Sequence, residues 1–214
     1  MNKVYSLIGA PRSGKGTVAK YLQETRKFEA YAFADKIKEE CGIDKDRFEF
    51  VKKYGSAQEA EEIRDKLWSY SAEKKKIDPN YFINIVLDNI LQVESNSVIT
   101  DLRTLDEYNV VANKCREQNL LFKSFFVCDS FNGSFKNDIL IGSDLTKDFI
   151  CENIESGSII CIFNNQQGLK DFFTKLDREF FIEDILDITS DKQYVRCKIS
   201  NYLNDYVIVK GRQW

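Results

Sequence analysis

The stretch Gly9-Ala10-Pro11-Arg12-Ser13-Gly14-Lys15-Gly16-Thr17 decides the fold, because it fits the pattern G-x-x-x-x-G-K of a phosphate-binding loop. Val4–Ile8 precedes it as an apolar run typical of a buried strand, and Gly14–Gln23 follows it with a helical pattern. The glycines let the backbone present N–H groups to phosphate oxygens, and the helix start adds partial positive charge. We therefore expect a nucleoside triphosphate here, with Lys15 reaching its β- and γ-phosphates. A plain glycine-rich turn before a helix is the alternative.

Gly16 stands where Ser or Thr usually follows the lysine of this pattern, so the hydroxyl for a metal ion moves one residue on, to Thr17. We expect ATP as the ligand and Mg²⁺ as the cofactor that accompanies it. The residues expected to bind ATP within the loop are Gly9, Arg12, Ser13, Gly14, Lys15, Gly16 and Thr17.

Strand-like and helix-like segments alternate along the chain, which predicts an α/β fold with a parallel five-stranded sheet and helices on both faces. The expected strands are Val4–Ile8, Glu29–Ala34, Ser97–Thr100, Leu120–Cys128 and Ser158–Phe163. The expected helices are Gly14–Gln23, Ile37–Tyr54, Ala57–Lys76, one opened by Asp78 as cap and Pro79, Leu105–Gln118 and Gln167–Leu176. Because parallel strands end at a common edge, residues that follow them, such as Asp35 and Asp101, are expected beside the phosphate loop.

Composition narrows the function further. The 214 residues carry 31 basic and 34 acidic side chains, a net charge of −3, so neither a nucleic-acid nor a membrane-surface partner is indicated. The chain has no histidine and six scattered cysteines without a C-x-x-C pair, which excludes His-dependent catalysis and argues against a zinc site. The apolar runs are too short for a signal peptide or a membrane span, so we expect a cytoplasmic protein. Whether it forms a homodimer stays open.

Two resemblances extend these expectations. The sequence GAPRSGKGT resembles the phosphate loop of adenylate kinases, although Arg12 stands where many of them have glycine. Four further motifs resemble those of the phage-type deoxynucleoside monophosphate kinases, and animal-type phosphomevalonate kinases share parts of the plan. These motifs are Phe33–Lys38, Arg64–Leu67, Ile77–Phe82 and Val98–Arg103 with Glu107; Cys161–Asn165 with Leu169 resembles the last strand and asparagine turn. The resemblance covers residues 3 to 176.

The resemblance implies a kinase that phosphorylates a nucleoside monophosphate, with a P-loop fold. Asn164 and Asn165 would join the ATP site, and Asp101 with Thr17 would hold the Mg²⁺ shell. Arg64 and Arg103 would bind the acceptor phosphate and act in catalysis with Lys15, because a guanidinium matches phosphate in bidentate fashion. Asp35 and Lys38 would flank the acceptor. Simpler roles remain open: Asp35 or Asp101 as helix caps, Arg64 and Lys38 on solvated surfaces, Arg103 paired with Glu107, and Asn164-Asn165 as a plain turn.

The expected organisation is a kinase domain at 1–177 with an acceptor-binding helical insert at about 35–93, a lid at about 129–147, and an extension of unknown role at 178–214. No arginine lies between Glu117 and Asp177, so such a lid could offer only Lys136 and Lys147 to the transferred phosphoryl group. Two other functions therefore remain open: a kinase for another small phosphorylated metabolite, and a nucleotide-binding module without efficient catalysis.

Overall fold

The computed structural model describes residues 2–128 and 132–163. In this part of the chain five strands form one parallel sheet in the order β2-β3-β1-β4-β7, which confirms the predicted α/β class. The strands are β1 (Lys3–Ile8), β2 (Glu29–Tyr31), β3 (Ser97–Ile99), β4 (Leu121–Cys128) and β7 (Ile159–Phe163). The expectations for Asn164, Asn165, the helix Gln167–Leu176 and the extension 178–214 lie outside the described residues.

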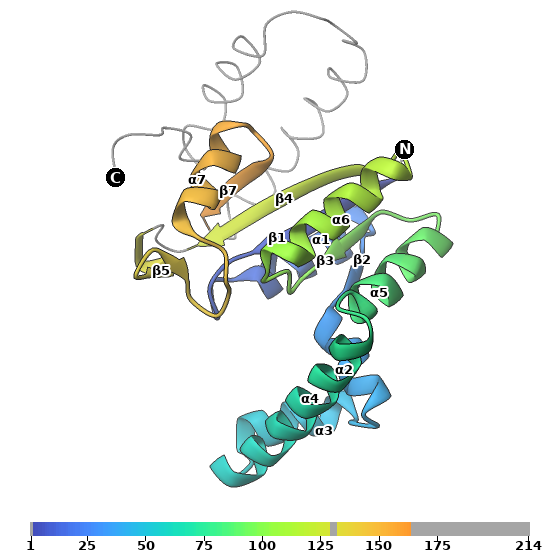
Figure 1. Ribbon diagram of the computed structural model, residues 1–214, viewed down its shortest axis with the longest axis vertical. Helices are drawn as coiled ribbons and strands as arrows, with labels where there is room; N and C mark the ends of the chain where they lie inside the picture. Colours follow the sequence, from blue (N-terminus) through green and yellow to red (C-terminus); the bar gives the residue numbers. More distant parts are fainter. Residues whose placement is uncertain (1, 129–131, 164–214) are drawn as a thin grey trace, which may run out of the picture.

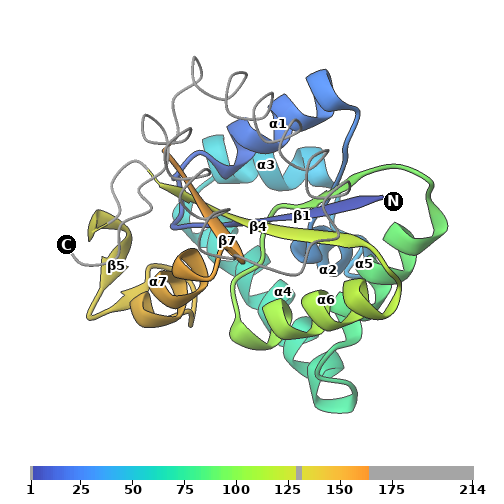
Figure 2. The ribbon, with the colours of Figure 1, turned by 90° about the horizontal axis from the view of Figure 1, so that it is seen from above.

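Helices cover both faces of the sheet, as the mostly apolar run Val4–Ile8 of the central strand predicts. Every residue of β1 after Lys3 is buried, which requires cover above and below. Figure 2 shows the sheet nearly edge-on, with α1 (Lys15–Arg26) on one side and α5 (Tyr81–Gln92) and α6 (Leu105–Glu117) on the other. The apolar faces that these helices bury against the sheet include Val18 and Leu22 of α1, Val86 and Ile90 of α5, and Val111 and Cys115 of α6.

A helical arm formed by α2 (Phe33–Glu40), α3 (Lys45–Tyr54) and α4 (Ala57–Ile77) follows the edge strand β2. In Figure 1, α3 and α4 extend away from the sheet, and no residue of α4 is buried. The Glu40 carboxylate ties the arm together, because it accepts hydrogen bonds from the hydroxyls of Tyr70 on α4 at 3.0 Å and Tyr81 on α5 at 3.1 Å. The arm occupies the region where the acceptor-binding insert is expected.

Several predicted boundaries shift, each for a local reason. Strand β2 ends at Tyr31, and Phe33 and Ala34 already belong to α2. The helix expected over Ile37–Tyr54 is split at Gly42, whose φ of +65° is left-handed. Asp78 does not begin the next helix: its carboxylate accepts the N–H of Asn80 at 2.8 Å in a turn, and α5 starts at Tyr81.

Between β4 and β7 the described chain forms elements that the sequence reading did not resolve. Asn132–Ser134 is a 3₁₀ turn, β5 (Phe135–Lys136) and β6 (Ile139–Leu140) form a short hairpin, and α7 (Lys147–Glu155) packs on β7. The missed signal for α7 is its apolar spacing, in which Ile150 and Ile154 lie one turn apart and are buried. Within the described residues, no helix combines the length and apolarity that crossing a membrane requires.

Helix α2 starts without a side-chain cap from its own sequence, since Ala32 stands at its N-cap. Asp101, which follows β3, supplies the cap from the neighbouring strand. Its two carboxylate oxygens accept the N–H groups of Phe33 and Ala34, each at 2.9 Å. The alternative that Asp35 caps a helix starting at Lys36 is therefore wrong, and the alternative that Asp101 is a cap is confirmed, although the helix that it caps is α2.

Asp101→Ala should lower the free energy of unfolding by about 2 kcal/mol, because two N–H groups at the start of α2 lose a charged acceptor. Urea denaturation followed by circular dichroism measures this change. Asp106→Ala is the matched control, since Asp106 lies in the first turn of α6, where Thr104 supplies the cap. That control should lose less than about 1 kcal/mol. Equal losses in the two variants would contradict the capping role of Asp101.

Candidate nucleotide and acceptor site

The phosphate loop lies between β1 and α1 at the carboxyl edge of the sheet, and its backbone requires glycine at two positions. Gly14 has φ +95°, a left-handed conformation, at the N-cap of α1. At Gly9 the space is missing: a Cβ there would lie 2.3 Å from the Val127 carbonyl oxygen and 2.6 Å from Ser13 Oγ. Arg12 also adopts a left-handed φ of +66°, so this arginine occupies a conformation that favours glycine.

The start of α1 has neither a side-chain cap nor an acidic side chain in its first turn, a feature that it shares with α5. Helices α3, α4, α6 and α7 each begin with a side-chain cap, supplied by Asp44, Ser56, Thr104 and Thr146. Helix α1 has no side-chain cap and no acidic residue in its first turn. Its N–H groups and its partial positive charge therefore remain available for an anion. Beside them, the Ser13 hydroxyl is buried without a hydrogen-bond partner among the described residues.

Lys15 folds back over the loop. Its Nζ donates to the carbonyl oxygens of Gly9 at 2.6 Å and Ala10 at 2.8 Å. Burial, and after it the cation of Arg103, lower the pKa of Lys15 from its ordinary 10.5 to about 8, although the carboxylate of Asp101 acts in the opposite direction. Lys15, Asp101 and Arg103 thus lie close enough to influence each other's charge, as their places at the ends of β1 and β3 predict.

Asp101 is the anion among these cations. Burial raises its pKa, whereas the hydrogen bonds from Ala34 and Phe33 and the charge of Arg103 lower it; the negative charge of Asp35 raises it again. The interaction with Asp35 and the two hydrogen bonds place the first turn of α2 next to Asp101. Each Asp101 oxygen accepts one N–H, which leaves a second lone pair on each.

Arg103 has a fixed backbone and an exposed side chain. The alternative that its guanidinium pairs with Glu107 is replaced by a different contact, in which Glu107 Oε2 accepts the backbone N–H groups of Arg103 at 2.8 Å and Thr104 at 3.0 Å. The Thr104 hydroxyl accepts in return from the N–H of Glu107, so the two residues form a capping box. The pattern T-x-x-E at positions 104–107 was a readable signal for this arrangement that the sequence interpretation missed.

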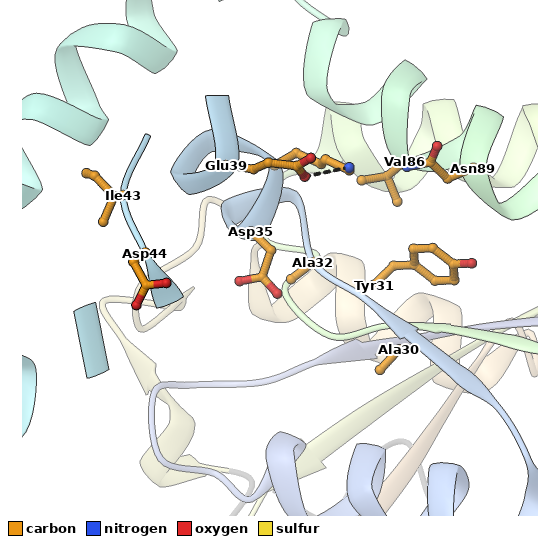
Figure 3. Close-up of a pocket in the computed structure, with 10 residues that line it drawn as sticks. Ala30, Tyr31, Ala32, Asp35, Glu39, Ile43, Asp44, Val86 and Asn89 are labelled. Carbon is orange, nitrogen blue, oxygen red and sulfur yellow. Dashed lines mark hydrogen bonds and ion pairs between the residues drawn. The ribbon is translucent and has the colours of Figure 1, made fainter. Parts of the chain in front are cut away.

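A cavity of about 520 Å³ opens beside Asp35, between the edge strand β2, helix α2 and helix α5. Figure 3 shows the carboxylates of Asp35 and Asp44 pointing to the same side. The ion pair between Lys36 and Glu39 forms another part of the lining, at 2.6 Å. The remaining lining residues are Ala30, Tyr31, Ala32, Ile43, Val86 and Asn89. Hydrogen-bond acceptors therefore outnumber free cations in this cavity, which suits a polar, uncharged group better than a phosphate.

Lys38 is held rather than free on the surface. Its Nζ lies 3.1 Å from Asp35 Oδ1 and 4.6 Å from the centroid of the Phe48 ring on α3. The Lys38 side chain is only 14% exposed, so the alternative of a solvated surface lysine is wrong. The contact joins the first helix of the arm to the second beside the cavity.

The structure does not bring every expected residue into this cluster. Arg64 is exposed on α4, and its Nε donates to the Ala60 carbonyl of its own helix at 3.0 Å. Gly16 is exposed with open space around it, and Thr17 lies half-buried in the first turn of α1. Within the described residues, no group of three or more Cys, Asp or Glu side chains is arranged to hold a metal ion.

No protein-family model and no curated protein matches the chain. Among solved structures, it is similar to a shikimate kinase from Aquifex aeolicus, with 13% identity and a TM-score of 0.41 over 83% of this chain and 98% of that one. A gluconokinase from Sinorhizobium meliloti has 10% identity and a TM-score of 0.42 over 85% and 97%. A protein provisionally described as a kinase, from Chloroflexus aurantiacus, has 12% identity and a TM-score of 0.38 over 61% of this chain. This chain spans 62% of that protein, less than two thirds of its length. Likenesses this weak do not bear on function, which rests on the site itself.

The lowered pKa of Lys15 predicts proton uptake when a polyphosphate binds. At pH 8 about half of the Lys15 side chains are neutral, and the negative phosphates raise the pKa, so binding should take up about half a proton per ATP. At pH 6.5 the lysine is already charged, and uptake should nearly vanish. Titration calorimetry in buffers with different ionisation enthalpies measures both values. The same number of protons at pH 6.5 and pH 8 would contradict this pKa.

The left-handed backbone of Arg12 predicts a stability gain on substitution by glycine. Arg12→Gly should raise the free energy of unfolding by about 0.5–1 kcal/mol, because the strain relieved exceeds the added flexibility of the unfolded chain. Arg12→Ala is the matched control: it removes the same charge but keeps a Cβ, so it should bring no gain. Chemical denaturation of both variants separates these effects, and an equal gain in both would attribute it to charge removal instead.

Proposed function

We propose that the protein transfers the terminal phosphoryl group of ATP to a small phosphorylated acceptor, and that this acceptor is a ribo- or deoxynucleoside monophosphate. One observation carries the proposal: a phosphate loop with an uncapped helix start lies within electrostatic reach of Asp101 and Arg103, and Asp101 in turn lies within reach of Asp35, which lines the cavity. We infer from it that a donor site and an acceptor site share one edge of the sheet.

On the donor side, the residues present fit the phosphates of ATP. The helix start, the buried hydroxyl of Ser13 and the ammonium of Lys15 offer donors and positive charge, and the first turn of α1 contains no acidic residue. Thr17 and Asp101 would hold Mg²⁺ together with the nucleotide phosphates, since this ion is commonly held by one or two protein oxygens plus phosphate oxygens. When bound, Mg²⁺ neutralises charge on the β- and γ-phosphates.

In the transfer itself the protein supplies position and charge. Lys15 neutralises negative charge on the phosphoryl group as it leaves ADP, and Arg103 balances the charge of the acceptor phosphate. The attacking oxygen of that phosphate is already ionised near neutral pH, so the protein needs no general base, and the absence of histidine is no obstacle. Asp101 keeps the two cations from repelling each other fully, because its carboxylate lies close to both.

On the acceptor side, the charges of the protein favour different places for the phosphate and for the nucleoside of a monophosphate. The phosphate belongs near Arg103, because the cavity beside Asp35 holds three carboxylates that repel it. Hydroxyl and amino groups of a nucleoside are hydrogen-bond donors that these carboxylates accept. The volume of about 520 Å³ lies within the range of small-molecule sites and accommodates a nucleoside. Lys38 orients Asp35 for this contact.

Lys15→Ala should abolish phosphoryl transfer and weaken ATP binding while leaving the fold intact, because Lys15 is half-buried over the loop and packs little apolar surface. The assay is ADP release from Mg·ATP with a panel of ribo- and deoxynucleoside monophosphates. Lys20→Ala is the matched control on the exposed face of α1, where Lys20 pairs with Glu24. Wild-type turnover in Lys15→Ala would remove the loop as the ATP site.

The same panel decides among the alternatives. Acceleration of ADP release by a nucleoside monophosphate supports the proposal. Acceleration only by another phosphorylated metabolite would keep the kinase and replace its acceptor. Tight ATP binding with no acceleration by any compound would favour a nucleotide-binding module.

A further inference from the structure

The turn 141–145, between β6 and α7, contacts Arg103 from the side opposite to Glu107. The Ser143 hydroxyl and the backbone N–H of Asp144 both donate to the Arg103 carbonyl oxygen, the latter at 3.2 Å. The Asp144 carboxylate accepts the N–H of Leu105 at 2.9 Å, in the first turn of α6. Residues nearly forty positions further along the chain thus hold the segment that carries Arg103.

The turn also touches the phosphate loop. Gly142 has φ +75°, and a Cβ added there would lie 3.1 Å from Pro11 Cγ and 3.3 Å from Pro11 Cδ. The same turn therefore contacts the donor loop through Gly142 and the acceptor side through Ser143 and Asp144. A glycine at this position lets the two backbones approach closely.

The turn is itself firmly anchored. Leu140 and Leu145, on either side of it, are each 1% exposed and belong to the main core. The N–H of Leu140 donates to the Leu145 carbonyl at 2.9 Å, and the N–H of Ile141 donates to the Ser134 carbonyl at 3.0 Å. The Ser143 hydroxyl oxygen also accepts the N–H of Leu145 at 3.1 Å. These contacts make the turn a rigid part of the sheet's carboxyl edge.

We propose that the turn 141–145 is a strut that sets the position of Arg103 relative to the phosphate loop, and that Ser143 and Asp144 are positioning residues acting through Arg103. Both backbone groups of Arg103 are held: its N–H by Glu107 and its C=O by Ser143 and Asp144. Its guanidinium stays exposed at the site. This role rests on the proposed function, because it concerns where the acceptor phosphate meets the donor.

Positioning is where phosphoryl transfer is most sensitive, because a displacement of about 1 Å can cost about a hundredfold in rate. Without the acceptor for the Leu105 N–H, the segment at the start of α6 should shift and take Arg103 with it. We therefore expect Asp144→Ala to lower kcat by about tenfold or more and to leave KM for ATP within about twofold. Asp144→Asn keeps an oxygen that accepts this N–H, so it should retain most of the activity.

A matched control is available in the same segment. Thr146→Ala removes a comparable cap hydrogen bond, from the Phe149 N–H to the Thr146 hydroxyl at 3.1 Å, without touching Arg103. It should leave kcat within about twofold of wild type even where it lowers the denaturation midpoint. A loss of kcat in Thr146→Ala equal to that in Asp144→Ala would overturn the strut, because general destabilisation would then explain both.

A double-mutant cycle tests whether Asp144 acts through Arg103. In an Arg103→Ala background, Asp144→Ala should change kcat by less than about twofold, since the group that it positions is gone. An undiminished, multiplicative loss in the double variant would overturn the inference. So would wild-type kcat in Asp144→Ala alone.

The results of these experiments distinguish a failure of this inference from a failure of the proposed function. Wild-type protein that transfers no phosphoryl group to any acceptor in the panel overturns both. Active wild-type protein whose Asp144→Ala variant is equally active overturns the strut only.

Discussion

The Asp101 carboxylate is the group on which the site depends. It lies at the end of β3, caps α2 through the N–H groups of Phe33 and Ala34, and lies within electrostatic reach of Lys15 and Arg103. A carboxylate removed from water is costly unless other groups compensate its charge, and here two backbone N–H groups and the nearby charge of Arg103 do so. The same group therefore joins the helical arm to the sheet and balances the cations at the phosphate loop. Changes in the arm and changes in the charge of the site are coupled through it.

Positive charge at the phosphate loop contrasts with negative charge around the cavity of the helical arm. Four helix starts have a side-chain cap that accepts a backbone N–H, while α1 has none where the loop bears Lys15. Across β3, the arm presents carboxylates around a cavity. A molecule with a strongly anionic end and a polar, uncharged end fits this contrast better than a purely anionic or a purely apolar ligand. A nucleoside monophosphate beside ATP has this character.

Much of the fold follows from the sequence because strong local patterns dominate it. The run Val4–Ile8 and the glycine-lysine loop place β1 and α1, and the apolar runs before Asp101 and after Gly157 place strands with little ambiguity. The misplaced boundaries lie where one residue overrides a pattern, as at Gly42, or where a distant residue supplies a cap, as Asp101 does for α2. Local sequence carries no sign of such a long-range cap.

Some residues of the site could likewise be predicted from the sequence, and others could not. The positions of Lys15, Asp101 and Arg103 follow from strand ends and were predictable. The contact of the turn 141–145 with Arg103 joins segments far apart in the chain, and the sequence pattern of neither segment predicts it. For Arg64 the sequence motif suggests a place in the acceptor site, but in the structure its Nε donates to a carbonyl of its own helix. A sequence motif predicts where the backbone of a residue lies, whereas the direction of its side chain depends on the surrounding packing.

The central claim is that donor and acceptor phosphates meet at this edge of the sheet. The most direct measurement follows a label on the γ-phosphoryl group of ATP during a single turnover with excess protein, Mg²⁺ and a nucleoside monophosphate. We predict that the label appears in the nucleoside diphosphate at least as fast as ADP is released. Label that appears only as inorganic phosphate, or that stays in ATP with every monophosphate tested, would contradict the account.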